Sequence, residues 1–261
     1  MGDILEGIVG RVRERLAAAP PDAARLRDAA QAHRGGDFRA AIEGGPRPAL
    51  IAEFKRRSPS KGPLNEGASL VDYCHAYASA GASAISILTN PDFGGDLADL
   101  SAARVAVEIP LLRKDFVIDP RQLLEAAAAG ADCVLLITRI VTPAQLTELA
   151  IEARELGLQT LIEIYEDEEL DTAIEAGPDL LGVNSRDLST FAVDTSKFGR
   201  IAAALPQGLP LVAESGVATR PQALAAAQAG ARAILVGEAL MTAADPAAAA
   251  GEMLGARLVR S

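Results

Sequence analysis

The feature that most constrains the fold of this chain is a short glycine-centred phrase that recurs along it. Each copy follows an Ala-rich segment with helical periodicity and precedes a short apolar run. The copies are Ala80-Gly81-Ala82, Ala129-Gly130-Ala131, Ala176-Gly177-Pro178 and Ala229-Gly230-Ala231, with Leu156-Gly157-Leu158 as a variant. Glycine commonly follows the last helical residue, and apolar runs without polar alternation are typical of parallel strands covered on both faces. The phrase therefore predicts a repeated unit of helix, glycine and buried strand.

Eight apolar runs of strand length can be counted in the chain. They are Ala49–Lys55, Ser83–Leu88, Pro110–Lys114, Asp132–Ile137, Gln159–Glu163, Leu180–Asn184, Leu209–Glu214 and Arg232–Gly237. Helix starts between them carry a capping residue with proline close behind, as at Asp119-Pro120, Thr142-Pro143, Thr219-Arg220-Pro221 and Asp245-Pro246. Eight strand–helix units in 261 residues predict an α/β protein, a (β/α)8 TIM barrel with an N-terminal helical extension. A doubly wound sheet is the alternative, but it usually has fewer strands, and neither glycine-rich nucleotide motif occurs here.

The segment before the first predicted strand has its own pattern. Apolar residues recur at helical spacing between Ile4 and Leu16, and a second short helical piece follows the loop-like Pro20-Pro21-Asp22. We expect an N-terminal helical extension at residues 1–48 and a barrel catalytic domain at residues 49–261, forming a single domain overall. The extension either plugs one end of the barrel or lies over the mouth of its active site, and the sequence leaves both readings open.

Composition and charge exclude several classes of protein. Hydrophobic residues make up 49% of the chain, which is enough for a sizeable core, and the formal net charge is −10. Such a charge speaks against nucleic acid or an anionic membrane as a partner. Two cysteines are too few for a disulfide framework, and neither a secretory signal nor an apolar run of membrane length is expected. We therefore expect a cytoplasmic protein and, because no long apolar stripe demands a partner, a monomer.

Charged residues at the ends of several predicted strands need an explanation, since a buried parallel strand should be apolar throughout. In the first strand Ile51, Glu53 and Lys55 share one face, while Phe54 points toward the helices. Active sites of TIM barrels lie at the carboxyl ends of the strands. Glu53 and Lys55 are therefore expected to point into the mouth of the barrel.

Four further strands end in the same way. Their polar ends are Arg113-Lys114-Asp115, Glu163, Asn184-Ser185-Arg186 and Glu214-Ser215. Any one of them could be a solvated rim residue or half of an ion pair, but five polar strand ends at one rim indicate an active site. A ring of glutamates and lysines in a water-poor mouth drives pKa values apart and supplies a proton donor and an acceptor near neutral pH. The pattern predicts acid–base chemistry.

Glycines follow the last two predicted strands. Gly216 and Gly237 stand where backbone N–H groups and a helix start can hold a phosphate, although both could be simple turn glycines. Lys55, with Ser58 and Lys61 in the loop behind it, is the nearest source of positive charge. Neither histidine has a partner at metal-ligand spacing. We expect an enzyme that acts on a phosphorylated small molecule, without a metal or another cofactor.

These residues stand in longer segments that resemble the indole-3-glycerol phosphate synthase family. The matching segments are 51–62 (IAEFKRRSPSKG), 86–89 (SILT), 112–120 (LRKDFVIDP), 161–163 (LIE), 182–188 (GVNSRDL), 213–217 (AESGV) and 236–241 (VGEALM). They fall on seven of the eight predicted strand ends, in the family's order. The resemblance implies a carboxy-lyase of tryptophan biosynthesis, which closes the ring of 1-(2-carboxyphenylamino)-1-deoxyribulose 5-phosphate with loss of carbon dioxide and water. It also implies no cofactor, since this chemistry needs proton transfer and a held anion.

The resemblance also implies a role for each matching residue. Lys114 would be the general acid, Glu163 the general base of the dehydration, and Lys55 a second proton donor or an anion contact. Glu53 and Asn184 would orient the sugar hydroxyls and the lysines. Ser215 is also implied to be catalytic and would complete the pocket with Glu214. The residues implied to bind the rest of the substrate are Ser58, Phe116, Arg186, Leu188 and Glu214, and those implied to bind its phosphate are Lys55, Gly216, Gly237 and Glu238.

The chain departs from the family pattern in the loop Thr89–Asp96, which is one residue shorter than usual and carries a single aromatic residue. Two other functions stay open from the residues alone. A phosphoribosyl isomerase would use the glycine pair but leaves Lys55, Lys114 and Glu163 unexplained. A non-catalytic phosphosugar-binding barrel is the other, although every matched proton-transfer position holds a competent residue type.

Overall fold

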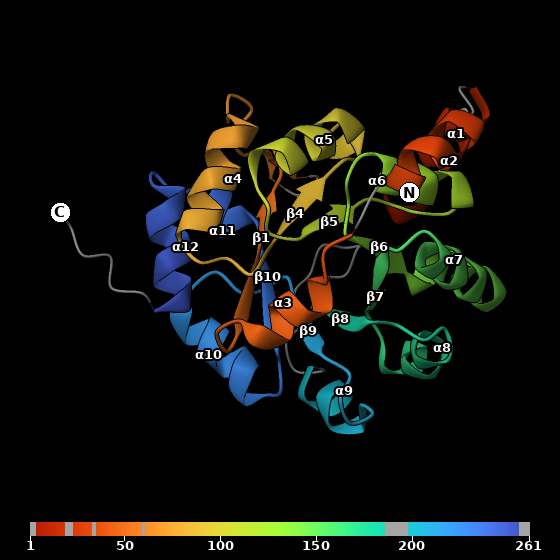
Figure 1. Cartoon of the computed structure of the whole chain (residues 1–261). Coiled ribbons are helices and arrows are strands. Elements are labelled where there is room, and N and C mark those ends of the chain that lie inside the picture. The colour runs from red at the N-terminus through yellow and green to blue at the C-terminus, as the bar shows by residue number, and fades with distance from the viewer. Residues whose placement is uncertain (1–3, 19–22, 33–34, 59–60, 186–197, 256–261) are drawn as a thin grey trace.

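The computed structural model describes residues 4–18, 23–32, 35–58, 61–185 and 198–255, and their central element is a closed barrel of parallel strands (Figure 1). The strands of the barrel are β1 (Ala49–Phe54), β4 (Ala84–Leu88), β5 (Leu111–Lys114), β6 (Cys133–Ile137), β7 (Gln159–Ile164), β8 (Leu180–Asn184), β9 (Leu211–Glu214) and β10 (Ala233–Val236). Around the barrel they follow the order β1-β10-β9-β8-β7-β6-β5-β4, each parallel to its neighbours. The predicted (β/α)8 barrel is confirmed, and each observed strand lies within or one residue beyond its predicted run.

Helices separate consecutive strands of the barrel and surround it. They are α4 (Leu70–Ser79), α5 (Leu97–Ala106), α6 (Pro120–Ala128), α7 (Pro143–Glu155), α8 (Leu170–Glu175), α9 (Phe198–Ala204), α10 (Arg220–Gln228), α11 (Glu238–Met241) and α12 (Pro246–Leu254). The glycine of the recurring phrase reverses the chain after a helix, with φ of +89° at Gly130 and +112° at Gly230. Asp119, Thr142 and Asp245 accept the N-capping hydrogen bonds expected of them.

Two apolar layers hold the barrel together. The outer layer lies between strands and helices and includes Leu50, Ala52 and Phe54. The inner layer fills the barrel and includes Ala49 and Ile51. The alternation predicted for β1 is therefore confirmed, with Phe54 on the helix side.

The N-terminal extension forms three helices, α1 (Ile4–Ala18), α2 (Ala23–Ala32) and α3 (Phe38–Gly44). In α3, Phe38 and Ile42 belong to the inner layer, and the backbone N–H of Arg39 donates to Gln159 at the start of β7. Helix α3 therefore closes the amino-terminal end of the barrel, where Figure 1 shows it lying in front of the strands.

Helix α1 lies at the other end. Its Arg11 contacts Asp92, 3.0 Å from Nε to Oδ1, in the short helix η1 (Pro91–Phe93) that follows β4. Helix α2 packs along α6 between the two ends. The sequence left open whether the extension plugs one end of the barrel or lies over the mouth of its active site. Helix α3 does the first and α1 lies at the end where the second was expected. Helix α3 itself was not predicted from the sequence.

The loop after β1 contains a second element that the sequence did not indicate. Two short strands, β2 (Arg57–Ser58) and β3 (Gly62–Pro63), pair antiparallel. They hold Ser58 in a buried position at the edge of the barrel mouth.

Candidate active site

The predicted site residues gather in one cavity at the carboxyl end of the barrel. Its volume is about 440 Å³. Among its lining residues are Glu53, Lys55, Ser58, Lys114, Phe116, Glu163, Asn184, Glu214, Ser215, Gly216, Gly237 and Glu238. Arg186 and Leu188 lie outside the described residues. The structure therefore brings together every predicted site residue that it describes.

Lys114 lies between two buried glutamates at the centre of this cavity. Its Nζ is 2.9 Å from Glu214 Oε2 and 3.4 Å from Glu163 Oε2, so that the ends of β5, β7 and β9 meet at one ammonium group. Burial acts to lower the pKa of Lys114, but the carboxylates of Glu214, Glu163 and Glu53 outweigh it and raise the pKa above its ordinary value. Lys114 therefore holds its proton at neutral pH.

Glu214 is the more buried of the two glutamates beside Lys114. It is 1% exposed, and its Oε1 has no hydrogen-bond partner within the described part of the chain. Loss of water on burial raises the pKa of Glu214 to about 8, because the attraction of Lys114 only partly offsets it and the neighbouring Glu163 adds repulsion. The cluster thus contains a proton that can be exchanged near neutral pH.

Gly182 makes room for this arrangement. A β-carbon at position 182 would lie 2.1 Å from Glu214 Oε1, closer than any real contact. Sequence reasoning missed Gly182, although a glycine inside a buried strand signals that another group approaches the backbone closely.

A second acid–base pair lies at the end of β1. Lys55 Nζ is 2.5 Å from Glu53 Oε1, and both side chains are largely buried. A β-carbon at Gly237 would lie 2.1 Å from Glu53 Oε1 and 3.1 Å from Lys55 Nζ. Gly237 is therefore needed to accommodate this pair, in addition to the phosphate-binding role expected from its position. Glu238, next to it, pairs with Lys61.

The turn after β9 has an unusual backbone. Ser215 and Gly216 have φ of +61° and +76°, and Ser215 is the sole non-glycine residue with positive φ among those described. Residues held in such conformations cluster at ligand sites, and turns of this kind form anion-binding concavities of backbone N–H groups. The geometry agrees with the phosphate position expected from the sequence.

Two aromatic rings form the apolar wall of the cavity. Phe93, from η1, and Phe116, from the loop after β5, have ring centroids 6.0 Å apart and planes tilted by 30°. Phe93 is the single aromatic residue of the shortened loop. It was not among the predicted site residues. Its position in the sequence, between the polar residues Thr89-Asn90 after a strand and the glycines Gly94-Gly95, could have indicated a role in the site.

The fold and the site together define the class of this protein: a (β/α)8 barrel with lysines and glutamates in a cavity at the carboxyl ends of its strands, the arrangement of an enzyme active site. The family model for indole-3-glycerol phosphate synthase matches residues 5–253. The chain belongs to this family.

Curated relatives agree over nearly the whole chain. Indole-3-glycerol phosphate synthase 2 of Streptomyces coelicolor is 44% identical over 250 residues, which cover 94% of this chain and 96% of the relative. The synthase of Mycobacteroides abscessus is 44% identical over 98% of this chain and 95% of its own. That of Parafrankia sp. is 50% identical over 77% of this chain and 75% of its own.

Solved structures are similar in fold. The α-subunit of tryptophan synthase from Pyrococcus furiosus superimposes with a TM-score of 0.63 at 16% identity, over 81% of this chain and 99% of that one. A 3-hexulose-6-phosphate synthase gives 0.63 at 19% identity, over 80% and 99%. At these identities the likeness supports the barrel fold alone.

Proposed function

We propose that this chain is an indole-3-glycerol phosphate synthase, which converts 1-(2-carboxyphenylamino)-1-deoxyribulose 5-phosphate to indole-3-glycerol phosphate with loss of carbon dioxide and water. Membership of the family carries the reaction. The single structural observation that supports the mechanism is the position of Lys114 between Glu163 and Glu214 at the bottom of the cavity. The enzyme is a carboxy-lyase of tryptophan biosynthesis.

Ring closure needs a proton donor. The ring carbon that bears the carboxylate attacks the ketone carbon, and Lys114 donates its proton to the ketone oxygen as that oxygen gains charge. Carbon dioxide then leaves, and its bonding electrons restore the aromatic ring. Glu214 lies 2.9 Å from the lysine and, in its ionised form, stabilises the ammonium between steps.

Dehydration needs a base and a second donor. Glu163 takes a proton from the substrate as the new hydroxyl leaves as water, and Lys55 or Lys114 protonates that hydroxyl. Lys55 Nζ lies 2.5 Å from Glu53 Oε1. The buried Asn184 binds a sugar hydroxyl of the substrate. These side chains lie at the ends of four strands, β1, β5, β7 and β8, and all line the same cavity.

The remaining groups hold the substrate. The Phe93 and Phe116 rings pack on its aromatic ring. Ser58 and Arg186 bind its carboxylate, Leu188 also contacts the substrate, and Lys55, Gly216, Gly237 and Glu238 bind its phosphate.

One assay tests this function. Purified protein is mixed with the substrate, and indole fluorescence is followed without added metal or nucleotide. The chain contains no tryptophan, so that the protein contributes little background. A growing indole signal supports the proposal. Absence of the signal, with protection of the protein by the substrate against thermal unfolding, would mean binding without this chemistry.

We also make three proposals about the location, domain organisation and oligomeric state of the protein. We place the protein in the cytoplasm, which agrees with two buried free cysteines, Cys74 and Cys133. No described helix combines the length and apolar character needed to cross a bilayer. We also propose that residues 1–48 fold with the barrel as one domain and that the protein is a monomer. Light scattering on the purified protein tests the oligomeric state.

A further inference from the structure

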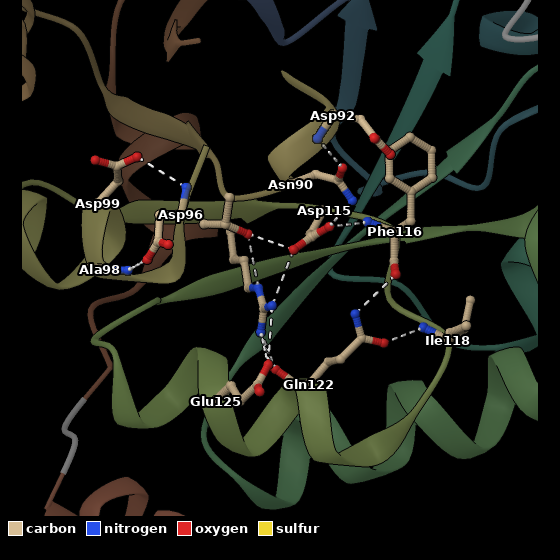
Figure 2. Close-up of polar contacts among 12 residues, drawn as sticks. Asn90, Asp92, Asp96, Ala98, Asp99, Asp115, Phe116, Ile118, Gln122 and Glu125 are labelled. Atoms are coloured by element: carbon tan, nitrogen blue, oxygen red, sulfur yellow. Dashed lines mark hydrogen bonds and ion pairs between the residues drawn. The ribbon is translucent and has the colours of Figure 1, made fainter. Parts of the chain in front are cut away.

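A second charged network involves the two residues next to Lys114 in the chain, and Figure 2 shows its polar contacts. It is built on Arg113 and Asp115, which flank Lys114 in the chain and are 4% and 7% exposed. Arg113 donates to the carbonyl of Gln122 in α6 at 2.5 Å and lies 3.3 Å from Glu125. The mechanism described above uses neither Arg113 nor Asp115.

Asp115 accepts four hydrogen bonds or charge-assisted contacts. Its Oδ2 is 2.7 Å from Thr89 Oγ1 and 3.1 Å from Arg113 Nη2. Its Oδ1 accepts from Asn90 Nδ2 at 2.9 Å and from the backbone N–H of Phe116 at 2.8 Å. Burial by itself would raise the pKa of Asp115, but Arg113 and these donors outweigh it and lower the pKa. The carboxylate is therefore charged and saturated, in contrast to Glu214.

Three of the four donors come from two loops of the barrel mouth, and the fourth, Arg113, lies in β5. Thr89 and Asn90 begin the loop after β4, and Phe116 belongs to the loop after β5. Figure 2 shows the Asp115 carboxylate between the Asn90 side chain and the start of Phe116. One buried group thus joins the segments that carry both aromatic rings.

Asn90 extends this control to Phe93. Its side-chain oxygen accepts from the backbone N–H of Asp92 at 3.0 Å and caps η1, while its carbonyl accepts from the N–H of Phe93 at 3.0 Å. The two polar atoms of the Asn90 side chain make different hydrogen bonds: the oxygen caps the start of η1, and the nitrogen donates to Asp115. Phe93, the last residue of η1, is oriented as a result.

We propose that Asp115 is a positioning residue of the reaction: by holding Asn90 and the Phe116 backbone, it sets the position of the Phe93 and Phe116 rings, against which the aromatic ring of the substrate packs. The proposal rests on the proposed function. Asp115 lies outside the acid–base cluster, and in this proposal it affects how the substrate fits and not how protons are transferred.

Two variants separate the network from the fold. Asn90→Asp keeps the size of the side chain and the oxygen that caps η1, but it replaces the donor to Asp115 with a carboxylate that repels it. Asp115→Asn removes the charge. Because Lys114 and Glu163 are untouched, we expect each change to raise KM, with a loss in kcat/KM of about 10- to 100-fold, and to change kcat less. The double variant restores one donor between the two positions, and its loss should be smaller than the product of the single losses.

Asp132→Asn is the matched control. Asp132 is also a buried aspartate paired with an arginine, Arg104 at 3.0 Å, but it lies at the amino-terminal end of the barrel. It should lower thermal stability and leave KM unchanged. Two results would each overturn the proposal: KM values of Asn90→Asp and Asp115→Asn equal to wild type, or an equal rise in KM for Asp132→Asn.

Amide hydrogen exchange of the free protein provides a readout that does not depend on turnover. In Asn90→Asp, residues 90–96 should exchange faster than in wild type, and the strands of the barrel should not. If wild type shows no turnover while this exchange difference is present, the proposed function fails and the positioning network stands. Unchanged exchange at residues 90–96 rules the network out even if turnover is normal.

Discussion

The two ends of the barrel hold their buried carboxylates in opposite ways. At the amino-terminal end, Asp132 accepts from the backbone N–H of Leu111 at 2.7 Å, from the N–H of Gly36 and from Arg104. At the carboxyl end, Glu214 is equally buried, yet one of its oxygens has no partner within the described residues and the other shares Lys114 with Glu163. Both ends contain ionised groups out of water, and they differ in how completely those groups are satisfied.

The difference suits the amino-terminal carboxylates to holding structure and the Lys114 cluster to the proton transfer that we propose. A buried carboxylate with a full set of donors is stabilised as an anion, and removing a partner is costly. Two carboxyl groups that compete for one ammonium cannot both be satisfied, so that a proton exchanges among them. Asp115 belongs to the first kind although it lies at the catalytic end, which is why we assign it a positioning role.

The largest change in kcat is expected when the ammonium shared by Glu163 and Glu214 is removed. Lys114→Met should lower kcat by about 10²- to 10⁴-fold, since it removes the ammonium that Glu163 and Glu214 share, while substrate affinity survives. Single-turnover rates and equilibrium binding measure the two quantities. Arg104→Met is the control at the opposite end and should reduce stability without this loss in kcat. Unchanged turnover in Lys114→Met would eliminate Lys114 as the acid.

A smaller effect is expected from crowding Glu214. Gly182→Ala places a β-carbon where Glu214 Oε1 lies, so the carboxyl group must move away from Lys114, and we expect kcat to fall by about 10- to 100-fold. Gly10→Ala in α1 is the matched control, because nothing lies within 4 Å of the added carbon. Steady-state kinetics on both variants decides the point: equal kcat values would show that Glu214 tolerates displacement.

The unsatisfied carboxyl group should also appear in the pH dependence of stability. The pKa of Glu214 is raised in the folded state, so its stabilising contribution is fully present below its ordinary pKa of 4.5 and is lost as pH rises through about 8. The free energy of unfolding of wild type relative to Glu214→Gln should therefore decrease from pH 5 to pH 9. Urea denaturation at both pH values measures it, and a difference that grows with pH would contradict the assignment.

The smallest effect on activity is expected at the satisfied end. Asp132→Asn leaves Arg104 and the Leu111 N–H with a weaker acceptor, and it should reduce the free energy of unfolding by about 1 to 3 kcal/mol. The kcat should stay at the wild-type value. A fall in kcat with unchanged stability would erase the distinction between the two ends.

The barrel could be predicted because its signals are local and repeated. Gly130 and Gly230 each mark the end of one helix and the beginning of one strand within a few residues. Polar strand ends such as Lys114 and Glu163 were visible for the same reason, since an ionisable residue at the end of an apolar run is unusual in itself. The roles of these residues came from the family resemblance and stay proposals.

Helix α3, the β2–β3 pair and the position of Phe93 could not be predicted in this way. Helix α3 is seven residues long and derives its stability from the barrel end that it covers, through Phe38 and Ile42. Propensity alone does not stabilise so short a helix. Phe93 is placed by Asn90 and Asp115, which lie 25 residues apart in the chain.

The amino-acid sequence by itself determined the repeating unit, the closed barrel and the set of ionisable groups at its mouth, because periodicity, capping and turn residues act over a few neighbouring positions. Only the tertiary structure decided the pairing of those groups: Lys114 meets Glu214 across 100 residues of chain, and Gly182 and Gly237 leave space for carboxylates of other strands. The physical reason is that a hydrogen bond or a pKa depends on distances of a few ångströms between strands, and closure of the barrel sets those distances.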